Sequence, residues 1–217
     1  IYEYIKQLGF DVLLNHKKSL KGLEIDIYIP EKMVGFEYNG LFWHSDKMGK
    51  HKTYHLNKQK MSSDVGIKLY HIFSDEWLNN PEIVKSKIKH ILGVNDNKIY
   101  ARKCVIKEIS VDEKQEFLNK THIQGGDKSK YKIGAYHNNE LVAVMTFSNQ
   151  RVSVGNKHVD GVFELVRFAS KNVVGIGSRL LKYFVKTYNP KKITSYADKR
   201  WTLSTNNVYE KLGFKLV

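Results

Sequence analysis

The chain has 217 residues, of which 41% are hydrophobic and 12% aromatic, enough to bury one large core or two smaller ones. No apolar run reaches the length of a membrane span, and the single cysteine, Cys104, excludes a disulfide framework and a cysteine-built zinc site. Lys and Arg number 36 against 22 acidic residues, so the net charge is +14. We expect a soluble cytoplasmic protein that belongs to a longer modular chain.

The first half of the sequence predicts a small sheet with flanking helices. Helical spacing covers Ile1–Leu8, and Gly9 is a suitable C-terminal stop. Leu23–Ile29 alternates apolar and polar residues and leads into a turn at Pro30–Lys32, which predicts a hairpin with acidic residues on both arms. Strands are expected at Phe10–Leu14, Leu23–Ile29, Met33–Tyr38 and Lys68–Phe73, and helices at Lys47–Val65 and Asp75–Leu92.

The Asn- and Asp-rich segment Gly93–Lys98 is the best linker candidate, so we expect two domains, at residues 1–98 and 99–217. The Asn138-Asn139 pair predicts a hairpin in the second domain. Its strands are expected at Lys107–Val111, Tyr131–His137, Glu140–Ser148, Val162–Ala169 and Lys192–Ala197, and its helices at Asp112–Lys120, Gly177–Tyr188 and Thr205–Leu212. The expected fold class is α/β (α+β): a mixed sheet flanked by helices, followed by a second α/β domain.

The basic excess is concentrated in the second half. Residues 1–100 carry 15 Lys against 12 acidic residues, a net charge of +3, whereas residues 101–217 carry 21 Lys and Arg against 10 acidic residues, a net charge of +11. Only five of the 36 basic residues are arginine, and a lysine excess suits sequence-independent attraction to phosphates more than base reading. A lysine-rich surface from an AT-rich genome is the simpler alternative; double-stranded DNA is the partner that we expect.

The predicted hairpin places Asp26 and Glu37 on adjacent antiparallel strands, where their carboxylates can meet at one end of the sheet. Two converging carboxylates suit Mg²⁺ or Mn²⁺, which keeps several waters and bridges to phosphate oxygens of a substrate. His44 and Asp46 follow within ten residues, and a histidine can move a proton while a second carboxylate orients it or completes the metal shell. The simpler alternative is that Glu37 pairs with a nearby lysine and His44 caps a strand end.

The runs IDIYIPEKMVGFEYNGLFWHSD, from Ile25, and HLNKQKMSSDVGIKLYHIFSDEW, from His55, resemble the very-short-patch-repair-like branch of the PD-(D/E)XK nucleases. Within it they are most similar to phage homing endonucleases with a Glu…Asp…x…His…Asp pattern. The resemblance covers about residues 1–92 and implies a metal-dependent DNA endonuclease. It implies metal ligands at Asp26 and Glu37 and a catalytic set of Glu3, Asp26, Glu37, His44 and Asp46.

Two departures from that pattern shape the expected chemistry. Asn39 stands where the usual nuclease motif has lysine, so His44 is expected to handle the proton rather than a lysine-activated water. The structural zinc ligands of the repair enzymes are absent. His51 and His55 have the four-residue spacing of paired zinc ligands, but no third ligand is evident and the surrounding lysines favour phosphate contact or solvent exposure.

A glycine-containing run in the second half, NVVGIGSR from Asn172, lies between a predicted strand and an amphipathic helix, so its backbone N–H groups can cradle a pyrophosphate. With ELVRFAS, VYEKLGF, FLNKTHIQGG and ELVAVMTFS it resembles the GNAT acyltransferase fold, particularly its phage Mom-like DNA-modification branch, over about residues 101–217. Asn172 departs from the usual Gln or Arg of the acetyl-CoA loop. The resemblance implies acetyl-CoA binding at Val174, Gly175, Ile176, Gly177, Ser178 and Tyr209.

Two residues near that loop have open alternatives. On the family pattern Tyr209 donates a proton to the leaving thiolate, but it can equally serve helix packing. Arg179 and the neighbouring lysines can equally hold DNA phosphates at the mouth of the cofactor cavity, in which case cofactor and DNA would compete.

Two functions therefore compete. The first is a phage-encoded homing or homing-like endonuclease, acting in the bacterial cytoplasm, whose basic second domain helps to grip DNA. The second is an acyl-CoA-dependent Mom-like DNA-modifying transferase with a degenerate nuclease domain. The intact acidic set and the charge of the second half favour the nuclease. A DNA-binding module with neither activity is the third alternative.

Overall fold

The computed structural model describes residues 1–40, 54–94, 98–149, 159–202 and 207–216. It divides into two compact units, Ile1–Val94 and Asn95–Val217. The division falls inside the Asn- and Asp-rich segment that the sequence marks as a linker. None of the helices in the described ranges is long and apolar enough to cross a bilayer.

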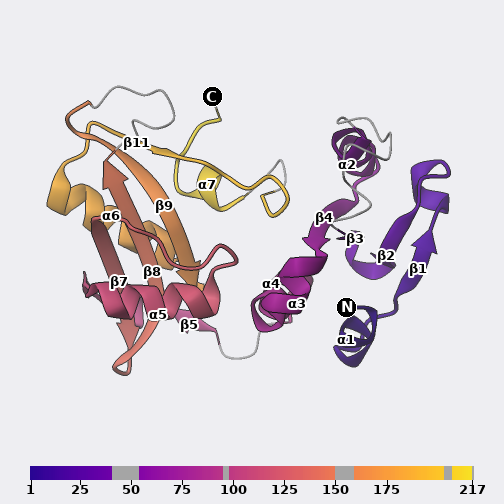
Figure 1. The fold of residues 1–217 in the computed structure, drawn as a ribbon, viewed down its shortest axis with the longest axis horizontal. Helices are drawn as coiled ribbons and strands as arrows, with labels where there is room; N and C mark the ends of the chain where they lie inside the picture. Colours follow the sequence, from indigo (N-terminus) through magenta and orange to yellow (C-terminus); the bar gives the residue numbers. More distant parts are fainter. Residues whose placement is uncertain (41–53, 95–97, 150–158, 203–206, 217) are drawn as a thin grey trace. The chain divides into compact units, whose positions relative to one another are not determined.

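The first unit is built on a four-stranded sheet in the order β1-β2-β3-β4 (Figure 1). The pairs β1/β2 and β2/β3 are antiparallel, whereas β3 and β4 are parallel. A short turn, Pro30–Lys32, joins β2 to β3 and ends at Met33 with a φ of 50°. The strands are β1 (Leu13–His16), β2 (Ile25–Ile29), β3 (Val34–Asn39) and β4 (Lys68–Phe73), and the helices are α1 (Tyr2–Gln7), α2 (Tyr54–Asp64), α3 (Ser74–Asn79) and α4 (Pro81–Leu92).

Close packing inside this sheet requires a glycine in β3. A Cβ atom at Gly35 would lie 2.8 Å from Leu69 Cδ1 and 2.9 Å from Ile25 Cγ2, closer than real carbon contacts allow. Leu69 and Ile25 belong to one buried hydrophobic cluster, whose other members are Leu20, Tyr28 and Ile67. This tight packing holds β2, β3 and β4 in a fixed register and so fixes the polar residues at the ends of these strands.

The second unit contains a five-stranded sheet in the order β11-β9-β8-β7-β6, antiparallel except for the parallel pair β11/β9. A separate two-residue pair, β5 (Ile99–Tyr100) with β10 (Val173–Val174), is parallel. The sheet strands are β6 (Val105–Glu108), β7 (Tyr131–His137), β8 (Glu140–Asn149), β9 (Val162–Ser170) and β11 (Lys192–Ser195), and the helices are α5 (Val111–Thr121), α6 (Ile176–Tyr188) and α7 (Val208–Lys211).

Helices α5 and α6 cover opposite faces of this sheet (Figure 1). Phe184 of α6 stacks on Phe147 of β8 with ring centroids 3.6 Å apart. Phe117 of α5 packs in another cluster with Val144, also of β8. Because successive strand residues point to opposite faces, Val144 and Phe147 of one strand serve different layers. The architecture is α/β, which confirms the fold class expected from the sequence.

A buried ion pair connects α5 with the segment that follows it, and a hydrogen bond connects that segment with the sheet. Lys114 is 1% exposed, and its Nζ lies 3.0 Å from Asp127 Oδ1. Asp127 Oδ2 accepts a hydrogen bond of 2.6 Å from Thr146 Oγ1 of β8, and Oδ1 accepts one of 2.9 Å from the Ser129 N–H. Burial opposes ionisation of Asp127, but these hydrogen bonds and Lys114 together lower its pKa. The charge of Lys114 is thereby compensated inside the unit.

One predicted element is divided in the structure. The sequence predicts a single helix over Asp75–Leu92, but Asn80 leaves the helical region, with φ −132° and ψ 49°, and separates α3 from α4. Pro81 is the first residue of α4, where its missing N–H needs no partner, and it disfavours helical backbone at the residue before it.

Candidate active site

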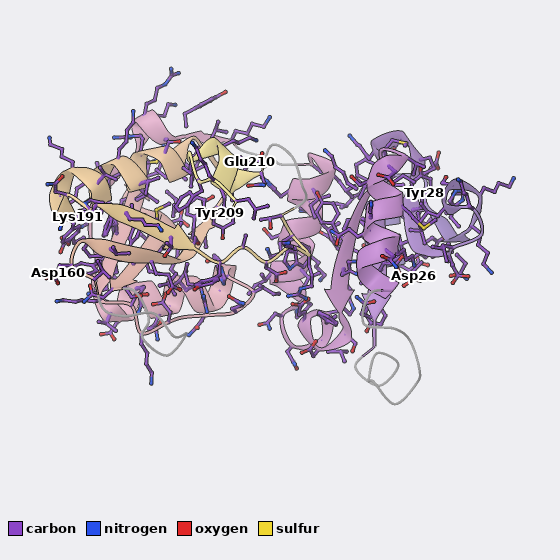
Figure 2. All side chains as sticks on the ribbon, turned by 90° about the horizontal axis from the view of Figure 1, so that it is seen from above. Asp26, Tyr28, Asp160, Lys191, Tyr209 and Glu210 are labelled. Atoms are coloured by element: carbon purple, nitrogen blue, oxygen red, sulfur yellow. The ribbon has the colours of Figure 1, made fainter. Side chains whose placement is uncertain are left out.

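Asp26 of β2 (Figure 2) and Glu37 of β3 lie on neighbouring strands of the first sheet. The β2/β3 register pairs Ile27 with Phe36, and its next step places Asp26 beside Glu37. Asp26 Oδ2 accepts a 2.8 Å hydrogen bond from the backbone N–H of Tyr38, which fixes one oxygen of that carboxylate. Glu37 is only 5% exposed, whereas Asp26 is partly open to solvent. The pair therefore combines a buried and an accessible carboxylate.

Glu37 also has a partner that sequence reasoning missed. Lys58 Nζ of α2 lies 2.5 Å from Glu37 Oε2, and both side chains are buried. Burial raises the pKa of Glu37, the hydrogen bond from Lys58 opposes that rise, and the nearby charge of Asp26 adds to it. The simpler alternative, an ion pair between Glu37 and a lysine, is thus present. In the sequence, the relevant signal was that position 39 carries asparagine where the usual nuclease motif has lysine. This departure indicates that a lysine beside the carboxylates must come from another segment.

The second oxygen of Glu37 has an unmet hydrogen-bonding capacity. Within the described part of the chain, Oε1 is buried and has no hydrogen-bond partner. A buried carboxylate oxygen without a partner is costly, and a cation shared with Asp26 would satisfy it. No group of three or more His, Cys, Asp or Glu side chains gathers among the residues that the structure describes. Mg²⁺ needs only one or two carboxylates when water and phosphate oxygens supply the remaining ligands, so the donor set fits that ion.

A third strand extends this polar row. The parallel β3/β4 register pairs Glu37 with His71, which is 5% exposed. His71 Nδ1 lies 3.0 Å from Asn39 Nδ2, and Asn39 is also buried. Asn39 therefore contacts a histidine instead of standing free in the place of the usual lysine. His71 was not among the predicted site residues, because its position depends on how β4 pairs with β3.

Of the remaining predicted catalytic residues, the structure describes only Glu3. Glu3 is exposed on α1, and among the described residues no hydrogen bond or ion pair links it to Asp26 or Glu37. His44 and Asp46 lie outside the described residues, as does His51. Their assigned roles stay predictions.

The predicted acetyl-CoA loop lies in the second unit, at the start of α6. Gly175 caps the helix with a φ of 78°, a conformation that favours glycine. Val174 already pairs with Tyr100 of β5. A Cβ atom at Gly177 would lie 3.2 Å from the Phe168 ring and 3.4 Å from Leu212 Cδ2. Close packing therefore accounts for Gly177 without a cofactor.

Arg179 follows this loop and is held by the chain itself. Its Nη1 donates hydrogen bonds to the carbonyl oxygens of Ala101 and, at 3.1 Å, of Cys104. These bonds give the Arg179 guanidinium group a structural role at the start of the second unit, and its contact with DNA phosphates stays a prediction.

Tyr209 lies on the four-residue helix α7 and is partly buried (Figure 2). Its ring meets Phe214 edge to face, with centroids 5.8 Å apart, and packs against the main core of the unit. These contacts are the helix packing that the sequence left open as an alternative to proton donation.

No sequence family matches the chain, and neither does any curated protein. Among solved structures, the catalytic domain of the homing endonuclease I-Bth0305I is 22% identical, covering 42% of this chain and 88% of its own, with a TM-score of 0.35. The ribosomal-protein-alanine N-acetyltransferase of Brucella melitensis biovar Abortus 2308 is 14% identical and covers 52% and 93%, with a TM-score of 0.36. A GNAT-family acetyltransferase of Streptococcus pneumoniae TIGR4 is 15% identical and covers 52% and 88%, with a TM-score of 0.37. These likenesses are too weak to support a functional assignment, which rests on the residues of the site.

Proposed function

We propose that the protein is a metal-dependent DNA endonuclease, of homing or homing-like type, that hydrolyses phosphodiester bonds in double-stranded DNA. The supporting observation is the buried Glu37 carboxylate beside Asp26: one oxygen is on Lys58, and the other has no hydrogen-bond partner among the described residues. Burying such a group has a cost that packing alone does not require. A divalent cation bound between Asp26 and Glu37 would contact this oxygen and so offset the cost.

In this proposal each side chain has a separate task. Asp26 and Glu37 would hold Mg²⁺ or Mn²⁺, which when bound supplies positive charge at the scissile phosphate and makes a water more acidic. The Tyr38 N–H orients Asp26, and the hydrogen bond from Lys58 favours the ionised form of Glu37. His44 is assigned the proton transfer to or from the attacking water or leaving oxygen. Asp46 and Glu3 are assigned supporting roles.

The direct test uses the full chain with supercoiled plasmid DNA. Incubation with Mg²⁺ or Mn²⁺ should convert the plasmid to nicked or linear forms, and EDTA should stop the reaction. Cleavage that persists in EDTA would contradict a metal-dependent mechanism. Folded protein that binds the plasmid but leaves it intact with both metals would contradict the nuclease itself.

The ion pair between Lys58 and Glu37 leads to a prediction about pH. Lys58→Met removes the cation that stabilises the ionised carboxylate, so the already raised pKa of Glu37 should rise further. A carboxylate must be ionised to hold a metal, and therefore the acidic limb of the pH–rate profile should move to higher pH. Near neutral pH we expect a loss of cleavage of about 10- to 100-fold, the usual effect of removing a group that supports a metal ligand.

Lys58→Arg is the matched variant for this experiment, because it keeps the charge and should keep the acidic limb closer to its original position. Equal profiles for the wild type and Lys58→Met, measured on folded protein, would show that Lys58 has no part in tuning Glu37.

The second candidate function is acyl transfer, favoured by one observation. The parallel pairing of β11 with β9 ends at Ser195 and Leu165. Strand β9 itself continues beyond this point to Ser170, and the chain then reaches Gly175 at the start of α6, where a cofactor phosphate would bind. Gly175 and Ser178 lie at the start of α6, where backbone N–H groups can bind a pyrophosphate, but Val174 and Arg179 are already engaged. We therefore expect weak acetyl-CoA binding without transfer.

Calorimetric titration with acetyl-CoA, with and without a short duplex, tests this expectation. Tight binding, together with transfer of the acyl group to DNA, would favour the DNA-modifying transferase over the nuclease as the function of the protein.

A further inference from the structure

One long segment of the second unit contains no acidic residue. From Leu165 to Ala197 the chain has no Asp or Glu, although basic residues recur throughout. The segment runs from the middle of β9 through α6 to the end of β11. Its basic residues are Arg167, Lys171, Arg179, Lys182, Lys186, Lys191 and Lys192.

Helix α6 presents part of this charge to solvent. Its buried residues, which include Leu180 and Phe184, pack against the sheet. Lys182 and Lys186 are exposed and four residues apart, so they lie on one side of the helix, one turn from each other. Within the described ranges neither lysine has an ion-pair partner. Lys191 and Lys192, also exposed, continue the basic run where the chain enters β11.

Helix α5, on the opposite face of the same sheet, has a different charge. Helix α5 exposes Asp112, Glu113 and Glu116. Of its two lysines, Lys114 is buried against Asp127, and Lys120 forms an ion pair of 2.7 Å with Glu116. A lysine-rich composition alone would make both faces basic. Helix α5 instead carries no net positive charge, whereas α6 carries Arg179, Lys182 and Lys186 and no acidic residue.

We propose that the exposed side of α6, defined by Lys182 and Lys186 and extended by Lys191 and Lys192, is the surface with which the second unit grips the backbone of duplex DNA. This inference rests on the proposed function, since it assigns the DNA contact of the same enzyme. The residues are lysines, which bind phosphates as point charges and do not read bases in pairs of hydrogen bonds. One helical turn separates Lys182 from Lys186, about 6 Å along the axis, or roughly two base-pair steps of DNA.

A purely structural role for these lysines would have a different signature. A cation in the last turn of a helix, such as Lys186, interacts favourably with the helix dipole, and its removal lowers stability slightly. It would not change the salt dependence of DNA binding. Each lost phosphate contact, in contrast, reduces the slope of log K against log salt concentration by about 0.9.

The experiment measures binding of the full chain to a 30-base-pair duplex of arbitrary sequence over a range of salt concentrations, with EDTA present to prevent cleavage. The double variant Lys182→Gln, Lys186→Gln should lose about two units of salt slope and bind about 10- to 100-fold more weakly at 0.1 M salt. The matched control is Lys120→Gln with Lys130→Gln, an equal charge change on α5 and in the segment after it, and it should bind nearly as the wild type does. Thermal unfolding verifies that both variants are folded.

Two results would overturn the assignment of this surface: an unchanged salt slope in the α6 variant, or an equal loss in the control. Preferential binding of single-stranded RNA over the duplex would overturn the choice of partner. Failure of the proposed function is separate, because wild-type protein that binds DNA through α6 but cleaves nothing would remove the nuclease and leave this surface in place.

Discussion

Asp26→Ala is expected to abolish plasmid cleavage while DNA affinity stays close to that of the wild type. The proposed cation needs the accessible carboxylate of Asp26, because Glu37 is buried and its Oε2 is already bound to Lys58. A metal contributes several kcal/mol to stabilising the charge of the transition state, and each 1.4 kcal/mol is about tenfold in rate, so a loss of about 10²- to 10³-fold or more is expected. His44→Ala should also remove cleavage if His44 handles the proton.

The control for this experiment comes from the same hairpin. Glu31 is exposed in the turn between β2 and β3, and Glu31→Ala removes an equal charge without touching the carboxylate pair. It should cleave as the wild type does. Asp26→Asn removes the charge alone, because it keeps the side-chain volume and an oxygen that can accept the hydrogen bond from the Tyr38 N–H. Full cleavage by Asp26→Ala would show that the site has been placed wrongly.

The hairpin that carries this pair could be predicted because its determinants are local. Alternating residues in Leu23–Ile29 and the turn at Pro30–Lys32 specify the two strands, and the structure has them at Ile25–Ile29 and Val34–Asn39. Once two strands are joined by a turn of fixed length, their register is nearly determined. The proximity of Asp26 and Glu37 follows from these local rules.

The partners of Glu37 could not be predicted in the same way. Lys58 is 21 residues away, and its contact depends on how α2 docks on the sheet. Helix α2 has no apolar stripe that would tell which of its residues point inward. His71 reaches Glu37 only through a parallel pairing across a crossover, which hydrophobic alternation does not specify.

The loop before α6 shows a second limit. A Gly-x-Gly run at a helix start has the same appearance whether it holds a phosphate or permits close packing. The structure provides the distinguishing contacts, since the Phe168 ring and Leu212 lie against Gly177, and Arg179 is bound to carbonyls 78 and 75 residues earlier in the chain. These contacts, which are invisible in the motif, give Gly177 and Arg179 structural roles and leave cofactor binding a prediction.

The largest effect on stability is expected at the buried pair of Lys114 and Asp127. Asp127→Ala leaves the ammonium group of Lys114, which is 1% exposed, without its counter-charge. Removing one partner of a buried ion pair typically costs about 3–5 kcal/mol, because the remaining charge is uncompensated. The variant also removes the acceptor for Thr146 Oγ1 of β8. We expect the free energy of unfolding of the second unit to fall by about that amount.

The measurement must report on the second unit alone. Hydrogen exchange of peptides from β8 does so, and denaturant dependence of that exchange gives the free energy. Glu116→Ala is the matched control, because it breaks the exposed pair with Lys120 on the same helix and should cause little loss. The double variant Lys114→Met, Asp127→Leu should recover much of the stability if the uncompensated charge is the cause. An Asp127→Ala variant as stable as Glu116→Ala would contradict this account.

The lowered pKa of Asp127 fixes the pH dependence of the effect. The ionised form is favoured in the folded state, so its contribution to stability is complete above the ordinary pKa of aspartate and disappears as the pH falls through the lowered native value. The difference between the wild type and Asp127→Ala should therefore be large at neutral pH and shrink on strong acidification. A difference that grows as the pH falls would mean that Asp127 is held in its protonated form and donates to Thr146 Oγ1, the reverse of the hydrogen bond in the structure.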